Sequence, residues 1–253
     1  MSSGSGVAES GTRQRLRAVL VDVDDTLYST TSFARRAREN SVRAMIVAGL
    51  SLPFEAVMAE LDEVVREFPS NYDRHYDSLL TRLPPSACGQ VNPAVVIASG
   101  VVAYHETKWR ELSASDDALE VLKRLGEKRG LLLGAATSGV PVKQAEKLVR
   151  LGVLKHLDPG GIFFAEQMGY SKHNPKFYAQ ACRVLGFPPG ECMIVGDHPV
   201  RDIDSPKRAG MVTVLYRGGG KYGDERGETV PDYTIQNFWD LLEIVERDFQ
   251  VVG

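Results

Sequence analysis

The stretch Arg17-Ala-Val-Leu-Val-Asp22-Val-Asp24-Asp-Thr26 decides the fold, because an almost unbroken apolar run ends abruptly in a turn rich in carboxylates. Such a run is typical of a strand that is buried on both faces of a parallel sheet. Parallel α/β sheets bind their ligands beyond the carboxyl ends of the strands. We therefore predict that this first strand delivers Asp22 and Asp24 to a ligand-binding edge.

The segment that follows this strand, residues 30–110, carries helical patterns without a convincing strand. Apolar side chains recur at helical spacing and predict four helices, at 33–48, 54–68, 72–82 and 93–109. Four helices of this kind form an all-α bundle. An insertion at this point of the chain is expected to cover the ligand-binding edge as a cap.

Beyond residue 115 the pattern changes to an alternation of strands and helices. The predicted strands are 131–136, 162–164, 192–195, 211–215 and 233–235, and the predicted helices are 116–128, 141–151, 175–185, 200–209 and 238–249. This rhythm indicates an α/β fold with a Rossmann-like, mostly parallel sheet core and an inserted four-helix-bundle cap. The predicted domains are a flexible tail (1–14), a catalytic core (15–29 and 111–253) and the helical cap (30–110).

Composition excludes several classes of protein. The chain has 253 residues, is 43% hydrophobic and carries a formal net charge of −3, so it can bury a full core but offers no basic field for nucleic acid. Three scattered cysteines, Cys88, Cys182 and Cys192, suit a reducing cytosol better than a disulfide framework or a zinc site. The longest apolar stretch, Ala94–Tyr104, is shorter than the roughly 20 residues of a membrane span. We expect a cytoplasmic protein with neither nucleic acid nor membrane as a partner.

Polar side chains follow the predicted strands at the edge where Asp22 and Asp24 lie. They are Thr137 and Ser138, then Lys172 ahead of a helix, then Asp197 and Asp202. Several carboxylates in one place repel one another unless a cation neutralises them, and oxygen ligands suit Mg²⁺. A hydroxyl, backbone N–H groups at a helix start and a lysine are suited to binding phosphate.

These groups are sufficient for phosphoryl transfer. Asp22 ends the strand and is predicted to attack phosphorus, while Mg²⁺ and Lys172 neutralise the growing charge. Asp24, already in the turn, is predicted to protonate the leaving group and then to activate water.

Four segments in chain order resemble the motifs of the haloacid dehalogenase superfamily of phosphohydrolases. They are Asp22-Val-Asp24-Asp-Thr26, Thr137-Ser138-Gly139, Lys172, and Gly196-Asp197 with Asp202. The resemblance implies that Asp22 is the nucleophile and a Mg²⁺ ligand, and that Asp24 is the acid/base and a ligand through its main-chain carbonyl. It implies that Asp197 is a further ligand. Asp202 and Thr26 are expected to contact the ligands without binding the metal themselves. Thr137, the Ser138 N–H and Lys172 would hold the phosphate. Asp24 favours phosphate-ester hydrolysis, because true dehalogenases lack this second aspartate.

Three further stretches resemble archaeal members described as glyceraldehyde-3-phosphate phosphatases. They are Phe33-Ala-Arg-Arg-Ala-Arg-Glu-Asn, Val102-Ala-Tyr-His-Glu-Thr-Lys108 and Pro141-Val-Lys-Gln-Ala-Glu-Lys147. This likeness implies a cytoplasmic, homodimeric phosphatase for a small phosphorylated metabolite. His173-Asn174 and Ser138-Gly139 depart from the usual family residues and put substrate contacts in doubt.

Substrate selection in the cap is assigned to Asn71, His75, Tyr76 and Lys108, which are equally compatible with a helix surface. The alternative functions are a phosphosugar mutase or nucleotidase of the same superfamily, or a non-catalytic phosphoacceptor or binding scaffold. A phosphoacceptor needs neither an inserted cap nor an acid/base at Asp24, which favours the enzyme.

Overall fold

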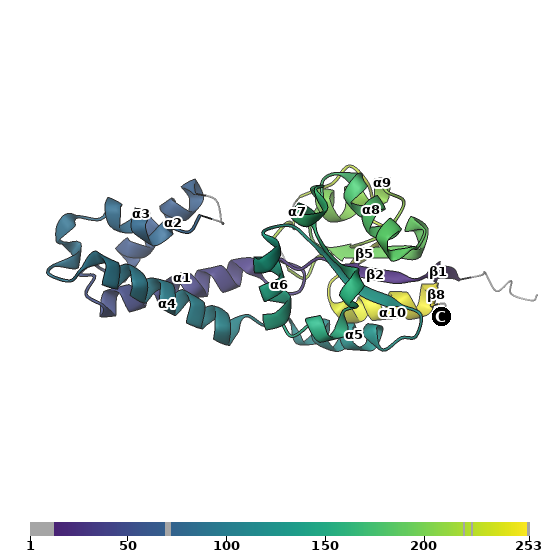
Figure 1. The fold of residues 1–253 in the computed structure, drawn as a ribbon, viewed down its shortest axis with the longest axis horizontal. Coiled ribbons are helices and arrows are strands. Elements are labelled where there is room, and N and C mark those ends of the chain that lie inside the picture. Colours follow the sequence, from purple (N-terminus) through teal and green to yellow (C-terminus); the bar gives the residue numbers. More distant parts are fainter. Residues whose placement is uncertain (1–12, 69–71, 220, 224, 252–253) are drawn as a thin grey trace, which may run out of the picture. The chain divides into compact units, whose positions relative to one another are not determined.

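The computed structural model describes residues 13–68, 72–219, 221–223 and 225–251, and the chain divides into two compact units (Figure 1). Residues 1–28 and 113–253 form one unit, here called the core unit, and residues 29–112 form the other, the cap unit.

The core unit is built on a six-stranded sheet in the order β4-β3-β2-β5-β6-β7, in which every neighbouring pair is parallel. The strands are β2 (Ala18–Val21), β3 (Leu132–Thr137), β4 (Ile162–Phe164), β5 (Cys192–Gly196), β6 (Val212–Tyr216) and β7 (Tyr233–Ile235). All four residues of β2 are buried, as its position between β3 and β5 requires. The predicted parallel α/β fold is confirmed.

Helices cover both faces of this sheet. They are α5 (Asp116–Gly126), α6 (Pro141–Arg150), α7 (Ala165–Met168), α8 (Pro175–Leu185), α9 (Ser205–Arg208) and α10 (Phe238–Asp248). Figure 1 shows α8 and α9 on one face of the sheet, and α5 and α10 on the other. Phe177 and Tyr178 of α8 pack against Leu20 and Ile194 in one buried apolar cluster, which fixes the start of α8 beside the end of β2.

The structure differs from the prediction at both ends of the core. Gln14, predicted as tail, begins the short strand β1 (Gln14–Leu16), which pairs in parallel with β8 (Phe249–Val251). The predicted helix 238–249 therefore ends one residue early, and Phe249 enters β8. Three-residue strands give too few positions for a periodic pattern, so the sequence did not reveal this pair. Residues 1–12 of the predicted tail lie outside the described residues.

The segment predicted as one helix, 200–209, consists of two different helices in the structure. A π-helix, Pro199–Asp204, comes first, and the short helix α9 follows. Pro206 lacks the N–H that a continuous helix would use at this point. A π-turn of this kind is frequent at functional sites, and this one carries Asp202.

The cap unit contains helices α1 (Thr30–Val47), α2 (Phe54–Glu67), α3 (His75–Arg82) and α4 (Pro93–Glu111) among its described residues. Ser29 caps α1, because its hydroxyl accepts from the Ser32 N–H. A second apolar cluster, which includes Met45, Leu61 and Leu79, joins these helices to one another.

In the described part of the chain, every helix is too short or too polar to span a lipid bilayer.

Candidate active site

The site begins with Asp22, the first residue after β2. Its N–H donates to Val195 O at 2.8 Å, which continues the pairing of β2 with β5 by one more residue. The carboxyl group is buried, and its Oδ1 accepts from Lys172 Nζ at 2.7 Å. The end of the strand therefore aims Asp22 into the core unit at the carboxyl edge of the sheet.

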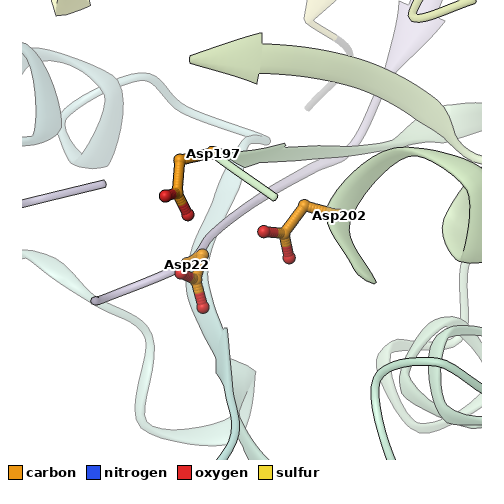
Figure 2. A group of neighbouring side chains, drawn as sticks. All are labelled: Asp22, Asp197 and Asp202. Atoms are coloured by element: carbon orange, nitrogen blue, oxygen red, sulfur yellow. The ribbon is translucent and has the colours of Figure 1, made fainter. Parts of the chain in front are cut away.

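Asp22, Asp197 and Asp202 form an acidic group whose ligand oxygens all lie within 4.8 Å of one another. Figure 2 shows these three side chains gathered beside the ends of the strands. Asp197 follows β5, and Asp202 projects from the π-helix. All three are buried, so their charges are poorly screened by water.

Burial dominates the electrostatics of this group. It raises the pKa of Asp22 to about 7, against the opposing effect of Lys172 and with a further rise from Asp202. Burial also raises the pKa of Asp197 to about 8, and the charges of Asp22 and Asp202 add to the rise. The carboxylates are therefore hard to ionise together unless a cation is present.

The donor set fits Mg²⁺, which prefers oxygen ligands. Asp197 Oδ2 is buried and has no hydrogen-bond partner among the residues that the structure describes. Such an atom is costly unless something binds it. Thr26 supports the other oxygen of the same carboxyl group, since its hydroxyl donates to Asp197 Oδ1 at 3.5 Å.

Asp202 belongs to the acidic group, but its oxygens are already engaged. Oδ1 lies 2.5 Å from Lys172 Nζ, and Oδ2 accepts from the His198 N–H at 3.1 Å. Tyr178 also donates to Oδ1 at 3.4 Å. These contacts make Asp202 a support for Lys172 and for the loop that carries Asp197.

Lys172 is buried between these carboxylates. Its ammonium group also donates to Ala136 O at 3.0 Å, on the neighbouring strand β3. Burial lowers the pKa of this lysine, but the charges of Asp202 and Asp22 raise it by more. The net pKa therefore lies well above the ordinary value of a lysine. Lys172 is therefore charged at neutral pH and fixed in place by three oxygens.

The segment predicted to bind phosphate leaves the end of β3. Thr137 is buried, and its hydroxyl donates to Gln144 Oε1 at 3.4 Å. Gly139 has φ +115°, which a side chain would disfavour, and its N–H donates to Glu166 Oε1 at 2.6 Å. The N–H predicted to meet the phosphate, that of Ser138, lies one residue earlier.

The side chain of Asp24 is directed to α6 and not to the acidic group. Lys147 Nζ lies 2.6 and 2.7 Å from its two oxygens. Gln144 Nε2 and the Tyr28 hydroxyl also donate to this carboxyl group, at 3.2 and 2.5 Å. Burial raises the pKa of Asp24, but Lys147 and the other donors outweigh it, and the pKa is lowered.

The sequence did not identify Gln144, Lys147, Tyr28 or Glu166 as site residues. A signal existed for two of them. Gln144 and Lys147 are three residues apart on a helix that starts from the predicted phosphate loop, so both lie on one face of it.

The turn after Asp24 is held by a loop from the far end of the chain. Asp25 is buried with φ +60°, a left-handed conformation that is unusual for a residue other than glycine. Lys221 Nζ lies 2.6 Å from Asp25 Oδ2. A Cβ at Gly219 would lie 2.4 Å from Asp25 O, so only glycine permits this approach. No motif in the sequence signalled this contact.

The predicted substrate-selecting residues belong to the cap unit, and Asn71 lies outside the described residues. His75 begins α3, and Lys108 lies near the end of α4. The Tyr76 hydroxyl donates to Ser41 Oγ at 2.7 Å within the cap unit, and burial raises its pKa to about 12. The part that these residues play in substrate selection stays a prediction.

Comparison with known proteins identifies the class. Residues 16–210 match the haloacid dehalogenase-like hydrolases, and the chain belongs to this family. A glyceraldehyde 3-phosphate phosphatase of Methanopyrus kandleri is 44% identical over 237 residues, which cover 92% of this chain and 98% of that protein. The predicted family membership is thereby confirmed, and the chain is a phosphoric monoester hydrolase of this family.

Solved structures agree on the fold. A phosphatase of this superfamily from Thermococcus onnurineus has a TM-score of 0.62 at 23% identity, covering 91% of this chain and 98% of that one. A 2-haloacid dehalogenase from Pseudomonas syringae has a TM-score of 0.60 at 22% identity, covering 92% and 99%. Since both chemistries occur on this fold, the fold alone does not separate them.

Replacement of Asp197 by asparagine tests the metal site. We expect Mg²⁺ at about 100 times its Kd to stabilise the wild-type protein by about 2.7 kcal/mol. In Asp197→Asn most of this gain should disappear, while the metal-free protein should become no less stable, because asparagine replaces a buried carboxyl group that is costly to ionise. Thermal unfolding with Mg²⁺ or EDTA measures both effects. Asp116→Asn, the same change on the surface of α5, should keep the full response to Mg²⁺, and an unchanged response in Asp197→Asn would contradict the assignment.

The raised pKa values predict how pH affects the metal-free protein. In the unfolded chain Asp22 and Asp197 ionise near 3.8, whereas in the folded chain they keep their protons up to about 7 and about 8. The free energy of unfolding in EDTA should therefore fall as the pH rises from 3.8 through about 7 and about 8. The Asp22→Asn/Asp197→Asn double variant should lose this dependence. If the wild type and the double variant show the same pH profile in EDTA, the raised pKa values are refuted.

Proposed function

We propose that this protein is a Mg²⁺-dependent phosphatase that hydrolyses small phosphorylated metabolites through a phosphoaspartate at Asp22. The observation that carries the proposal is the meeting of Asp22, Lys172 and two further buried carboxylates at one edge of the sheet. Asp24 supports hydrolysis of an ester, since it supplies the proton that an alkoxide leaving group requires.

The chemistry takes two steps. An oxygen of Asp22 attacks phosphorus and the P–O bond to the leaving group breaks. Asp24, whose pKa Lys147 and the other donors hold low, first takes up a proton from solvent and then gives this proton to the departing oxygen. Asp24, now a carboxylate, then takes a proton from water that attacks the phosphorus of the phosphoaspartate. Inorganic phosphate leaves, and Asp22 is restored.

The chain's own groups prepare both steps. Lys172, fixed by three oxygens, presents a permanent positive charge beside Asp22 and offsets charge that develops on the phosphoryl oxygens. Thr137 and the Ser138 N–H are suited to orienting the phosphate. Mg²⁺, held by Asp22, Asp197 and the main-chain carbonyl of Asp24, would supply further positive charge to the same oxygens.

For the substrate we propose glyceraldehyde 3-phosphate. Support comes from relatives with this named activity in several archaea, of which two are 44% and 34% identical to this chain. His173 and Asn174, which depart from the usual family pattern beside Lys172, are the positions at which the substrate preference could differ.

We also propose that the protein works in the cytoplasm as a homodimer, without nucleic acid or membrane as a partner. Three cysteines, scattered along the sequence, are too few for a disulfide framework and suit a reducing compartment. The cap unit exposes Val47, Val95 and Val102, apolar side chains that a second copy could cover. Sedimentation velocity should give about twice the chain mass, and a monomer at all concentrations would refute the dimer.

Phosphate release from a panel of phosphoesters, first with Mg²⁺ and then with EDTA, tests the function. We expect metal-dependent release with a preference for glyceraldehyde 3-phosphate. Asp22→Asn should abolish turnover, and Asp24→Asn should lower it by about 10²–10⁴-fold, the usual contribution of a general acid/base.

The same panel separates the alternatives. A phosphosugar mutase would isomerise a sugar phosphate without releasing phosphate, and a nucleotidase would prefer a nucleoside monophosphate. A phosphoacceptor would take up one phosphate per chain and would hardly respond to Asp24→Asn. Absence of release across the panel in the presence of Mg²⁺ would refute the phosphatase.

A further inference from the structure

One face of α6 holds the carboxyl group that we propose as the acid/base. Gln144 and Lys147 both project from this face, and both donate to Asp24, which lies more than a hundred positions earlier in the chain. The proposed mechanism gives neither residue a role. Their shared contact with Asp24 indicates a common role at this carboxyl group.

Lys147 makes the shorter contacts. Its ammonium group reaches both oxygens of Asp24, at 2.6 and 2.7 Å, so it fixes the direction of the carboxyl plane as well as its place. The pair is sheltered, with 20% of the Lys147 side chain and 32% of the Asp24 side chain exposed. A partly sheltered pair with two contacts is better defined than an ordinary surface ion pair.

Gln144 connects this carboxyl group to the predicted phosphate site. Its Nε2 donates to Asp24 Oδ2 at 3.2 Å, and its Oε1 accepts from the Thr137 hydroxyl at 3.4 Å. One buried amide thus spans the proposed acid/base and the hydroxyl predicted to hold the phosphate. The distance between these two groups is set by a side chain that has no need to touch the substrate.

The surrounding residues leave this arrangement little freedom. The Tyr28 hydroxyl donates to Asp24 Oδ1 at 2.5 Å, on the same oxygen that Lys147 reaches. At Gly139 a Cβ would lie 2.8 Å from Gln144 Nε2, so the glycine makes room for the amide.

We propose that Lys147, together with Gln144, is a positioning residue that orients the carboxyl group of Asp24 for proton transfer to the leaving group and from the attacking water. The proposal rests on the phosphatase function argued above. In this proposal α6, which follows the predicted phosphate loop, also determines the position of the acid/base relative to the bound phosphate.

The leaving group provides a sharp test of this role. An alkoxide leaves only with a proton, whereas p-nitrophenolate is a weak base and leaves without one. Misplacing Asp24 should therefore harm the hydrolysis of an alkyl phosphate much more than that of p-nitrophenyl phosphate. A general loss of structure would harm both substrates alike.

The experiment compares kcat/KM for glyceraldehyde 3-phosphate and for p-nitrophenyl phosphate, both with saturating Mg²⁺. Lys147→Met keeps the length of the side chain and removes its charge, and Lys147→Arg keeps the charge. Asp24→Asn provides the reference pattern. Lys143→Ala removes a lysine from the exposed side of the same helix and is the matched control.

We expect Lys147→Met to lower kcat/KM for the alkyl phosphate by about tenfold to a hundredfold, as a misplaced catalytic group does. The loss on p-nitrophenyl phosphate should be at most about threefold, because that step needs little acid catalysis. Lys147→Arg should recover part of the activity, and Lys143→Ala should match the wild type. In an Asp24→Asn background, Lys147→Met should cost little more, since Lys147 acts through Asp24.

Equal losses on the two substrates, or no loss on either, would overturn the proposal. So would full additivity of Asp24→Asn and Lys147→Met. A Lys147→Met protein that keeps its Mg²⁺-dependent rise in melting temperature is folded with its acidic group intact, so misfolding is recognised separately. If the wild-type protein hydrolyses neither substrate, the phosphatase function has failed, and this result differs from an active wild type with unselective variants.

Discussion

The buried ammonium group of Lys172 is the interaction on which the site depends. It contacts Asp22 at the end of β2, Ala136 O on β3 and Asp202 in the π-helix, and so joins three segments that are far apart in the chain. Removing one partner of a buried pair leaves an uncompensated charge and typically costs about 3–5 kcal/mol. The nucleophile that we propose is therefore held in place by the same contact that makes its burial tolerable.

We infer the type of reaction from the second aspartate, Asp24, and not from the fold. Related folds carry out both dehalogenation and phosphate-ester hydrolysis, so the sheet and its helices do not decide between them. In the mechanism that we propose, Asp24 decides between them, because a proton donor is useful only where the leaving group is a strong base. Gln144 and Lys147 of α6 donate to Asp24, so a helix outside the acidic group holds the residue that we propose as the acid/base.

The sequence predicts most of the core, because long apolar runs and repeated strand–helix alternation leave a strong pattern. The run that becomes β2 places Asp22 at the sheet edge, and parallel pairing brings the ends of β3 and β5 beside it. Lys147 was missed because a lysine on an amphipathic helix looks like a solvated residue until the fold supplies its partner. Lys221 was missed for a stronger reason, since its contact with Asp25 depends on a loop whose path no local pattern encodes. The π-helix at Pro199 follows from an irregular hydrogen-bond pattern that apolar periodicity does not contain.

The parallel pairing of β1 with β8 brings the two ends of the core unit together. β1 leads directly into the amino end of β2, so this pair lies at the edge of the sheet opposite to the carboxyl end that carries Asp22. β1 and β8 could therefore be joined through a short linker and the core unit reopened elsewhere, and such a circular permutant would keep the carboxyl edge of the sheet undisturbed. For the same reason, β1 and β8 both lie away from the carboxyl edge at which we propose that the substrate binds.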